Sequence, residues 1–293
     1  LQNNPLVDSI KKAITKKSLG ALKTLKENSI GKYKEFWTEY GLVLKEGPAE
    51  DFENKELISS LMLFNSSNFA DISETTCLDE YLKNMKSDQE EIYFCVADTY
   101  EAAKNSPHIE KLKSEGIEVL LLTDRIDEWL MTSIFEYKGK QLKNVAKEAL
   151  SKETETPKIN ENDKDIIEKI KTQLSDRVSD VLISDRLIDS ATCLILPQSE
   201  PGAQLRKILE ASGQNFGESR PIFEINIKHK LLKKLKNMKG KQFNSFVNFL
   251  YDYALIAEGA SPKDPSKYLR PVSYTHLRAH ETEADLVCRL LLE

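Results

Sequence analysis

The sequence predicts an α+β fold, and three observations carry this prediction. Apolar residues recur at helical spacing through 1–65, which indicates a short layer of amphipathic helices. Near-continuous apolar runs at 92–97 and 117–122 flank a helical stretch, as expected of parallel strands that are covered on both faces. Beyond a polar linker at 151–162, further strand-like runs and a helical seam predict a separate domain of helices and a small sheet.

The composition fits a soluble protein of about two domains. Of the 293 residues, 40% are hydrophobic and 30% are charged, and no apolar run approaches the ~20 residues that a membrane-spanning helix needs. The net charge of −5 argues against general nucleic-acid binding. The cysteines are far apart, which fits buried thiols in a reducing cytoplasm. Because the chain lacks both an initiating Met and a signal-peptide pattern, we expect it to begin inside a longer protein.

The helical layer is expected to contain three helices, of which the third lies around Leu57, Leu61 and Phe64. The first begins at Asn4, with Pro5 in its first turn, and buries an apolar stripe. The stripe consists of Leu6, Ile10, Ile14, Leu22 and Leu25. The second covers 30–40, ends at Gly41 and precedes a Gly47-Pro48 break. Its aromatic face consists of Tyr33, Phe36, Trp37 and Tyr40.

The αβα unit is expected over 76–150, with its two strands joined by a right-handed crossover. Asp98 is expected to cap the helix after the first strand, with Glu101 as its capping-box partner. Ser106-Pro107 begins another helix, and Gly116 ends it.

The second domain is expected over 163–270. Its first helix buries a face formed by Ile166, Ile167, Ile170, Leu174 and Val178. Strands are expected at 180–183, 191–196 and 221–227. The segment 271–293 differs from the rest because it contains no lysine, and it resembles a tail that recurs at the ends of unrelated conceptual translations. We expect this tail to be non-native.

Three carboxylates follow the second buried strand, at the edge where α/β sheets place ligands. Asp124, Asp127 and Glu128 can act as helix caps and first-turn acids, or they can hold Mg²⁺ in a metal-dependent α/β enzyme. Capping is the simpler interpretation, since the sequence contains no GxGxxG, GxxxxGK[ST] or GxSxG motif. A nucleic-acid-binding module is a further alternative, based on the lysine-rich segment 228–241. That segment lacks interleaved aromatic residues and also fits the solvated face of an amphipathic helix.

Two apolar features fit either a core or a partner-binding role. Trp129 stands just after a helix start, where a large ring is usually buried, but a partly exposed ring would be an anchor for a partner. The segment 201–209 is a short amphipathic helix behind Gly202, and its apolar face can pack inward or remain open.

Two long stretches stand out in order along the chain. They are Phe-Trp-Thr-Glu-Tyr-Gly-Leu-Val-Leu-Lys-Glu-Gly-Pro-Ala-Glu-Asp at 36–51 and Gly-Ile-Glu-Val-Leu-Leu-Leu-Thr-Asp-Arg-Ile-Asp-Glu-Trp at 116–129. Both resemble the heat-shock protein 90 chaperones of the bacterial HtpG type, and looser matches follow at 184–194, 222–226 and 250–259. The resemblance covers about 1–270 and implies the rear of the family's middle domain followed by most of its C-terminal domain.

The resemblance implies part of an ATP-dependent, homodimeric chaperone that binds unfolded or partly folded client proteins. In that family, ATP and Mg²⁺ bind an N-terminal domain that precedes the segment seen here. Gln2 matches the glutamine of the family's catalytic loop, and the loop's arginine would lie ahead of Leu1. The segment itself is therefore expected to hold no cofactor and to hydrolyse no ATP.

The resemblance also assigns binding residues. Client proteins contact the residues that match Trp129, Leu205, Ile208 and Leu209. At Pro201 and Leu205 the chain departs from the family's methionines, so the surface keeps less of the adaptability of Met. Dimerisation is assigned to one seam, formed by Phe243, Phe246, Val247, Leu250 and Ala254. We expect a cytoplasmic homodimer weakened by the altered tail, with no nucleic-acid or membrane partner.

Overall fold

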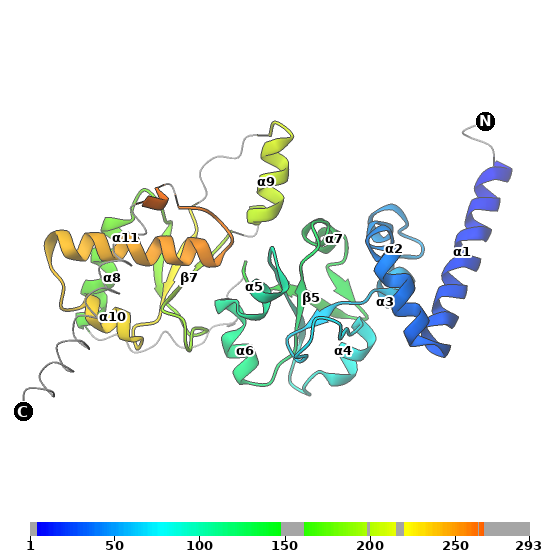
Figure 1. The fold of residues 1–293 in the computed structure, drawn as a ribbon, viewed down its shortest axis with the longest axis horizontal. Helices are drawn as coiled ribbons and strands as arrows, with labels where there is room; N and C mark the ends of the chain where they lie inside the picture. Colours follow the sequence, from blue (N-terminus) through cyan, green and yellow to red (C-terminus); the bar gives the residue numbers. More distant parts are fainter. Residues whose placement is uncertain (1–4, 148–160, 198–199, 215–219, 263, 267–293) are drawn as a thin grey trace, which may run out of the picture. The chain divides into compact units, whose positions relative to one another are not determined.

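The computed structural model describes residues 5–147, 161–197, 200–214, 220–262 and 264–266 (Figure 1). The chain divides into two compact units, of which the first contains 1–152 and 196–217 and the second contains 153–195 and 218–293. The segment 196–217 therefore belongs with the first unit, although the sequence places it in the second domain. Helices combined with small mixed sheets confirm the predicted α+β class.

The first unit is built on a sheet of five strands in the order β1-β3-β2-β5-β4. Its strands are β1 (Asn65–Ser66), β2 (Glu91–Val96), β3 (Val119–Leu122), β4 (Glu136–Tyr137) and β5 (Lys140–Asn144). Strand β2 pairs in parallel with both β3 and β5, whereas the edge strands β1 and β4 pair antiparallel. The predicted parallel pairing of the two apolar runs is thus confirmed.

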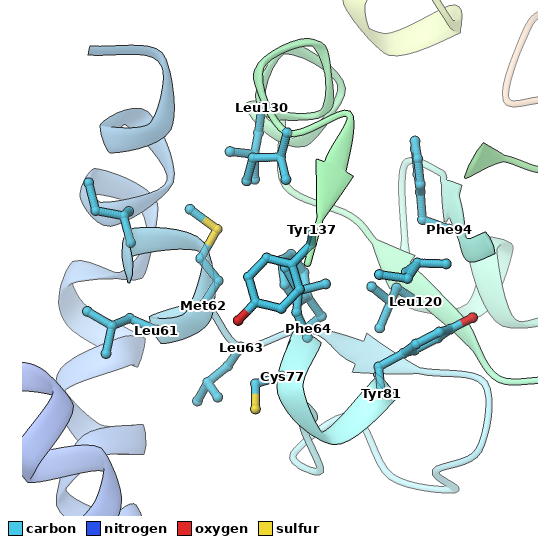
Figure 2. Close-up of a cluster of buried hydrophobic side chains, with 14 of the residues drawn as sticks. Leu61, Met62, Leu63, Phe64, Cys77, Tyr81, Phe94, Leu120, Leu130 and Tyr137 are labelled. Atoms are coloured by element: carbon cyan, nitrogen blue, oxygen red, sulfur yellow. The ribbon is translucent and has the colours of Figure 1, made fainter. Parts of the chain in front are cut away.

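Both faces of this sheet are covered, which explains why its central strands are apolar without alternation. Leu120 and Leu122 of β3 enter one core, whereas Val119 and Leu121 enter the other. Figure 2 shows the first core, in which Phe64, from the segment after α3, and Tyr137, from β4, lie between Met62 and Leu120 in this view. The second core lies against α5, η1 and α6.

The helices that connect these strands are α4 (Leu78–Asn84), α5 (Tyr100–Lys104), η1 (Pro107–Ile109), α6 (Glu110–Ser114) and α7 (Asp127–Ser133). The cap of α5 is Thr99, whose hydroxyl accepts the N–H of Ala102 at 3.2 Å, so the predicted cap at Asp98 is wrong by one residue. Ser106 caps η1, and Gly116, at φ 65°, ends the helical stretch as predicted.

The second helix of the chain is longer than predicted. α2 (Ile30–Glu50) continues through Gly41 and includes the Gly47-Pro48 break, so the predicted end at Gly41 is wrong. Gly41 serves close packing instead, because a Cβ there would lie 2.8 Å from the ring of Trp37. Tyr33, fully buried, donates a hydrogen bond of 2.5 Å to the carbonyl of Leu61 and so ties α2 to the end of α3 (Lys55–Leu61).

The first helix, α1 (Pro5–Asn28), is buried along only part of its length. Leu22 and Leu25 pack against the core as predicted, but Leu6, Ile10 and Ile14 are exposed, so this half of the predicted stripe is wrong. The predicted helix is confirmed, but only its second half packs against the core.

The second unit has a sheet of three strands in the order β6-β8-β7. Its elements are α8 (Glu161–Gln173), β6 (Asp180–Ile183), β7 (Thr192–Ile195), β8 (Ile222–Ile225), α10 (Lys230–Leu235) and α11 (Gly240–Ala257). Strand β8 is parallel to β6 and antiparallel to β7, and all three strands were predicted within one or two residues. Ile166, Ile170 and Leu174 are buried against this sheet, which confirms the predicted face.

Cys77, Cys95 and Cys193 are buried thiols outside any disulfide, as predicted, while Cys288 and the whole of the suspected tail lie outside the described residues. None of the described helices combines the length and apolarity needed to cross a membrane.

Candidate functional site

Helix α7 presents Trp129 to solvent. The helix follows β3 through the loop at 123–126, and its Leu130 and the next residue after the helix, Ile134, are fully buried. Trp129 and Thr132, three residues apart, form the exposed side of the helix. Trp129 is 41% exposed, so the core interpretation of this residue is wrong.

Lys45 holds the start of α7 against α2. Its ammonium lies 2.6 Å from Oδ2 of Asp124 and 2.6 Å from Oδ1 of Asp127. The other oxygen of Asp127 accepts the backbone N–H of Asp124 at 2.9 Å. Burial raises the pKa of Asp127 above its ordinary value, and the ammonium of Lys45 offsets part of this rise.

These contacts bear on the two interpretations of the carboxylates. Asp127 and Glu128 stand in the first turn of α7, as the capping interpretation expects, although the N-cap itself is Ile126 and makes no side-chain cap. The cation that Asp124 and Asp127 bind is a lysine of the same chain. Across the described ranges, no group of three or more His, Cys, Asp and Glu side chains is placed to hold a metal ion.

Glu128 connects α7 to a distant segment. Glu128 is only 7% exposed, and its Oε1 lies 2.8 Å from the ammonium of Lys147. The same oxygen accepts the backbone N–H of Gly202 at 2.6 Å. The segment that carries Gly202 is thereby attached to the residue that precedes Trp129.

Helix α9 (Ala203–Ala211) follows directly. Leu205, Ile208 and Leu209 recur at helical spacing on one face. Leu205 and Leu209 are half-buried, and the side chain of Ile208 lies outside what the structure describes. The first unit therefore contains both features that the sequence left undecided: the tryptophan and the amphipathic helix.

Comparison with known proteins matches 1–284 to the family described as Hsp90 protein. This chain belongs to the Hsp90 family. It is 41% identical to chaperone protein HtpG of Legionella pneumophila strain Paris over 279 residues, which cover 93% of the chain and 45% of that relative. Chaperone protein HtpG of Shewanella halifaxensis is 39% identical over 92% of the chain and 44% of the relative. The chain thus spans a little under half the length of these curated relatives.

The predicted dimerisation seam of this Hsp90 family member faces its own core. Four of the five residues, namely Phe243, Val247, Leu250 and Ala254, are buried within the second unit. Phe246 is half-buried, and it begins a second apolar row on α11. This row consists of Phe246, Phe249, Tyr253 and Ile256, and its last two members are exposed.

The lysine-rich segment forms a short helix with a solvated face. Leu232 and Leu235 of α10 are buried, Leu231 is half-buried, and the lysines of the helix are exposed. His229 caps it by accepting the N–H of Leu231 at 3.2 Å. This arrangement matches the amphipathic-helix interpretation.

An exposed aromatic residue went unnoticed in the sequence. Phe135, just beyond α7, is 63% exposed, and the ammonium of Lys55 lies 4.6 Å from its ring centroid. The sequence carries no clear signal for it, because an aromatic residue beside the apolar Ile134 fits a core equally well. Gln2, the predicted catalytic-loop glutamine, lies outside the described residues.

Proposed function

We propose that this chain is the client-binding and self-associating part of a cytoplasmic, ATP-dependent chaperone of the HtpG type. Membership of the Hsp90 family and the identity to proteins named chaperone protein HtpG support the proposal. ATP and Mg²⁺ belong to the longer protein under this proposal. This chain alone is expected to hydrolyse no ATP, since its sequence has no phosphate-binding motif.

The exposed indole of Trp129 is the observation that carries client binding. An exposed aromatic ring on a rigid helix offers a large apolar contact area to a partly folded protein at little cost in side-chain entropy. The adjacent Glu128 attaches α9, which adds half-buried leucines at 205 and 209. The proposed client surface therefore consists of Trp129, Leu205, Ile208 and Leu209.

An aggregation assay tests this surface. The full chain is mixed with a heat-denatured reporter enzyme, and light scattering is followed over time. Trp129→Ala and Leu209→Asp are each expected to weaken suppression of aggregation several-fold, because they remove apolar contact area or place a charge in it. Ile72→Ala is the matched control, since Ile72 is an exposed apolar residue in the loop beside edge strand β1. Unchanged suppression in both surface variants would refute the proposed client surface.

We infer further that self-association uses the outer row of α11. The residues first assigned to dimerisation are occupied by the core of their own unit, whereas Tyr253 and Ile256 remain exposed. The row from Phe246 to Ile256 has the 3–4 spacing of a helix-packing seam. Two copies of such a seam can pack as neighbouring helices of a bundle.

Sedimentation velocity of the full chain tests this inference. Ile256→Asp is expected to shift the molecule toward monomer by at least tenfold in dissociation constant, because it places a charge within an apolar contact. Lys241→Asp, a charge change at an exposed position of the same helix, is the control and is expected to leave the distribution unchanged. A distribution that does not respond to Ile256→Asp would exclude this face.

A further inference from the structure

The carboxylate of Glu128 serves the starts of two helices. It stands in the first turn of its own helix, α7, and it accepts the N–H of Gly202. The carbonyl of Gly202 accepts the N–H of Arg206 at 2.9 Å, so Gly202 is the residue that opens α9. The first N–H groups of a helix carry partial positive charge, which makes a nearby carboxylate favourable. Glu128 therefore stabilises the beginning of a helix 74 residues further along the chain.

The contact leaves no room for a side chain at position 202. A Cβ on Gly202 would lie 2.9 Å from Oε2 and 3.1 Å from Oε1 of Glu128. Lys147 holds the carboxylate from another direction, with a side chain that is itself only 16% exposed. Because the carboxylate is buried and held by Lys147, a methyl group at position 202 would push the start of α9 away from it.

A second attachment flanks the first. The N–H of Leu196 donates to the carbonyl of Ala146 at 3.3 Å, one residue before Lys147. Between the two attachments, Glu200 pairs with Arg206 of α9 at 3.1 Å. The path from 196 to α9 is thus tied to the first unit at both ends.

We propose that Glu128 is a positioning residue that docks α9 next to Trp129 and fixes the spacing between the indole and the apolar face of the helix. The effect of this spacing on client binding rests on the proposed function. The docking itself does not, because it can be measured with no client present.

Hydrogen–deuterium exchange on the full chain measures the docking. Glu128→Ala removes the acceptor, and Gly202→Ala blocks the approach while leaving the Glu128–Lys147 pair in place. Each variant is expected to speed exchange of the α9 amides about tenfold or more, since a hydrogen bond to a charged group is lost. Glu128→Gln keeps an oxygen acceptor but no charge, and it is expected to give a smaller increase.

A double-variant cycle separates docking from general damage. If both residues act through one contact, Glu128→Ala combined with Gly202→Ala is expected to exchange no faster than the faster single variant. Glu136→Ala, at an exposed glutamate of β4, and Gly20→Ala, at a helix position with open space around it, are the controls and should match the parent. Unchanged α9 exchange in both single variants, or strictly additive increases, would overturn the proposal.

A client measurement then tests the consequence of docking. Affinity for a fluorescently labelled, destabilised model protein is expected to fall at least fivefold in Gly202→Ala, whose substitution leaves Trp129, Leu205 and Leu209 in place. Faster α9 exchange with unchanged affinity in Gly202→Ala, alongside a loss in Trp129→Ala, would overturn the positioning role and leave the proposed function standing. If Trp129→Ala also binds normally, the proposed function fails, and the exchange data alone decide the docking.

Discussion

Two adjacent carboxylates attach α7 to two different helices, and they do so in different surroundings. Asp127 is fully buried and binds Lys45 of α2, whose side chain is 5% exposed. Glu128 binds Lys147 and the start of α9 beside a cavity of about 220 Å³ that both side chains help to line. Lys45 and Asp127 of the first attachment are buried, although the second partner of Lys45, Asp124, is 45% exposed. Glu128 and Lys147 of the second attachment border a cavity.

This difference separates a contact that maintains the fold from one that sets the position of a surface element. An ion pair without water costs several kcal/mol when one partner is removed, because the remaining charge stays buried. A pair that borders a cavity can be rehydrated, so its loss costs less and its effect stays local. Stability is therefore expected to depend on Lys45, and the placement of α9 on Glu128.

The largest effect is expected from Lys45→Met. It leaves Asp127 charged in the core and should lower the free energy of unfolding of the first unit by about 3–5 kcal/mol. Urea unfolding followed by tryptophan fluorescence measures this unit selectively, since Trp37 and Trp129 both belong to it. Adding Asp127→Asn is expected to restore more than half of the loss. A loss below about 1 kcal/mol would remove the distinction drawn between the two attachments.

Glu128→Ala is expected to cost less, about 1–2 kcal/mol in the same unfolding experiment. Lys147 and the N–H of Gly202 each lose a charged partner, but Lys147 lines the cavity, from which water can reach it. A cost equal to that of Lys45→Met would show that the second attachment also belongs to the core.

A third buried carboxylate, Glu118, differs from Asp127 and Glu128 because a hydroxyl rather than a lysine is its partner. Glu118 accepts a hydrogen bond of 2.6 Å from Ser66, and burial raises its pKa above the ordinary value of 4.5. As pH rises from 4.5 toward the raised pKa, the unfolded chain releases its proton first, so stability falls with rising pH. Glu118→Gln is expected to raise stability at pH 7 by about 1 kcal/mol.

The gain from Glu118→Gln should disappear as pH is lowered toward the ordinary value of 4.5, where the native carboxyl is already protonated. Unfolding curves at several pH values measure it, with the exposed Glu115→Gln as the control. A gain that is independent of pH would mean that packing, rather than charge, limits stability at this position.

The smallest effect is expected from Trp129→Ala, within about 0.5 kcal/mol of the parent, because the indole is largely outside the core. Circular dichroism at increasing temperature measures it independently of tryptophan fluorescence. A large loss of stability would return Trp129 to the core and weaken the client-binding proposal.

The strands were predictable because their signal is local. A run such as 119–122 is apolar at every position only if both faces of its sheet are covered, and parallel pairing then follows from the helix between two such runs. The strands of the second unit were likewise marked by short apolar or alternating runs.

The extent of α2 was not predictable for the opposite reason. Gly41 is locally a stop signal, and its actual role depends on the ring of Trp37 lying against it. The last turns of α2 are held by Lys45, whose partners lie about 80 residues away in the chain. Distant contacts of this kind also determine which of the two apolar faces of α11 enters the core.

The candidate site shows the same division. Family resemblance marked Trp129 and the helix at 203–211, but neither residue pattern nor spacing indicated that Glu128 joins them. Gly202 appeared in the sequence only as a flexible residue before a helix. Its requirement for a bare backbone becomes visible when the carboxylate is seen 2.9 Å from the missing Cβ.

The continuity of α2 has a mechanical consequence. A helix of 21 residues is about 31 Å long at 1.5 Å per residue, and it is fastened near one end through Tyr33 and near the other through Lys45. Because α2 is attached at both ends, we expect it to move as one rigid body with the rest of the first unit. Ser29 is the single residue between α1 and α2. We therefore expect any change in the angle between α1 and α2 to occur mainly at the backbone of Ser29.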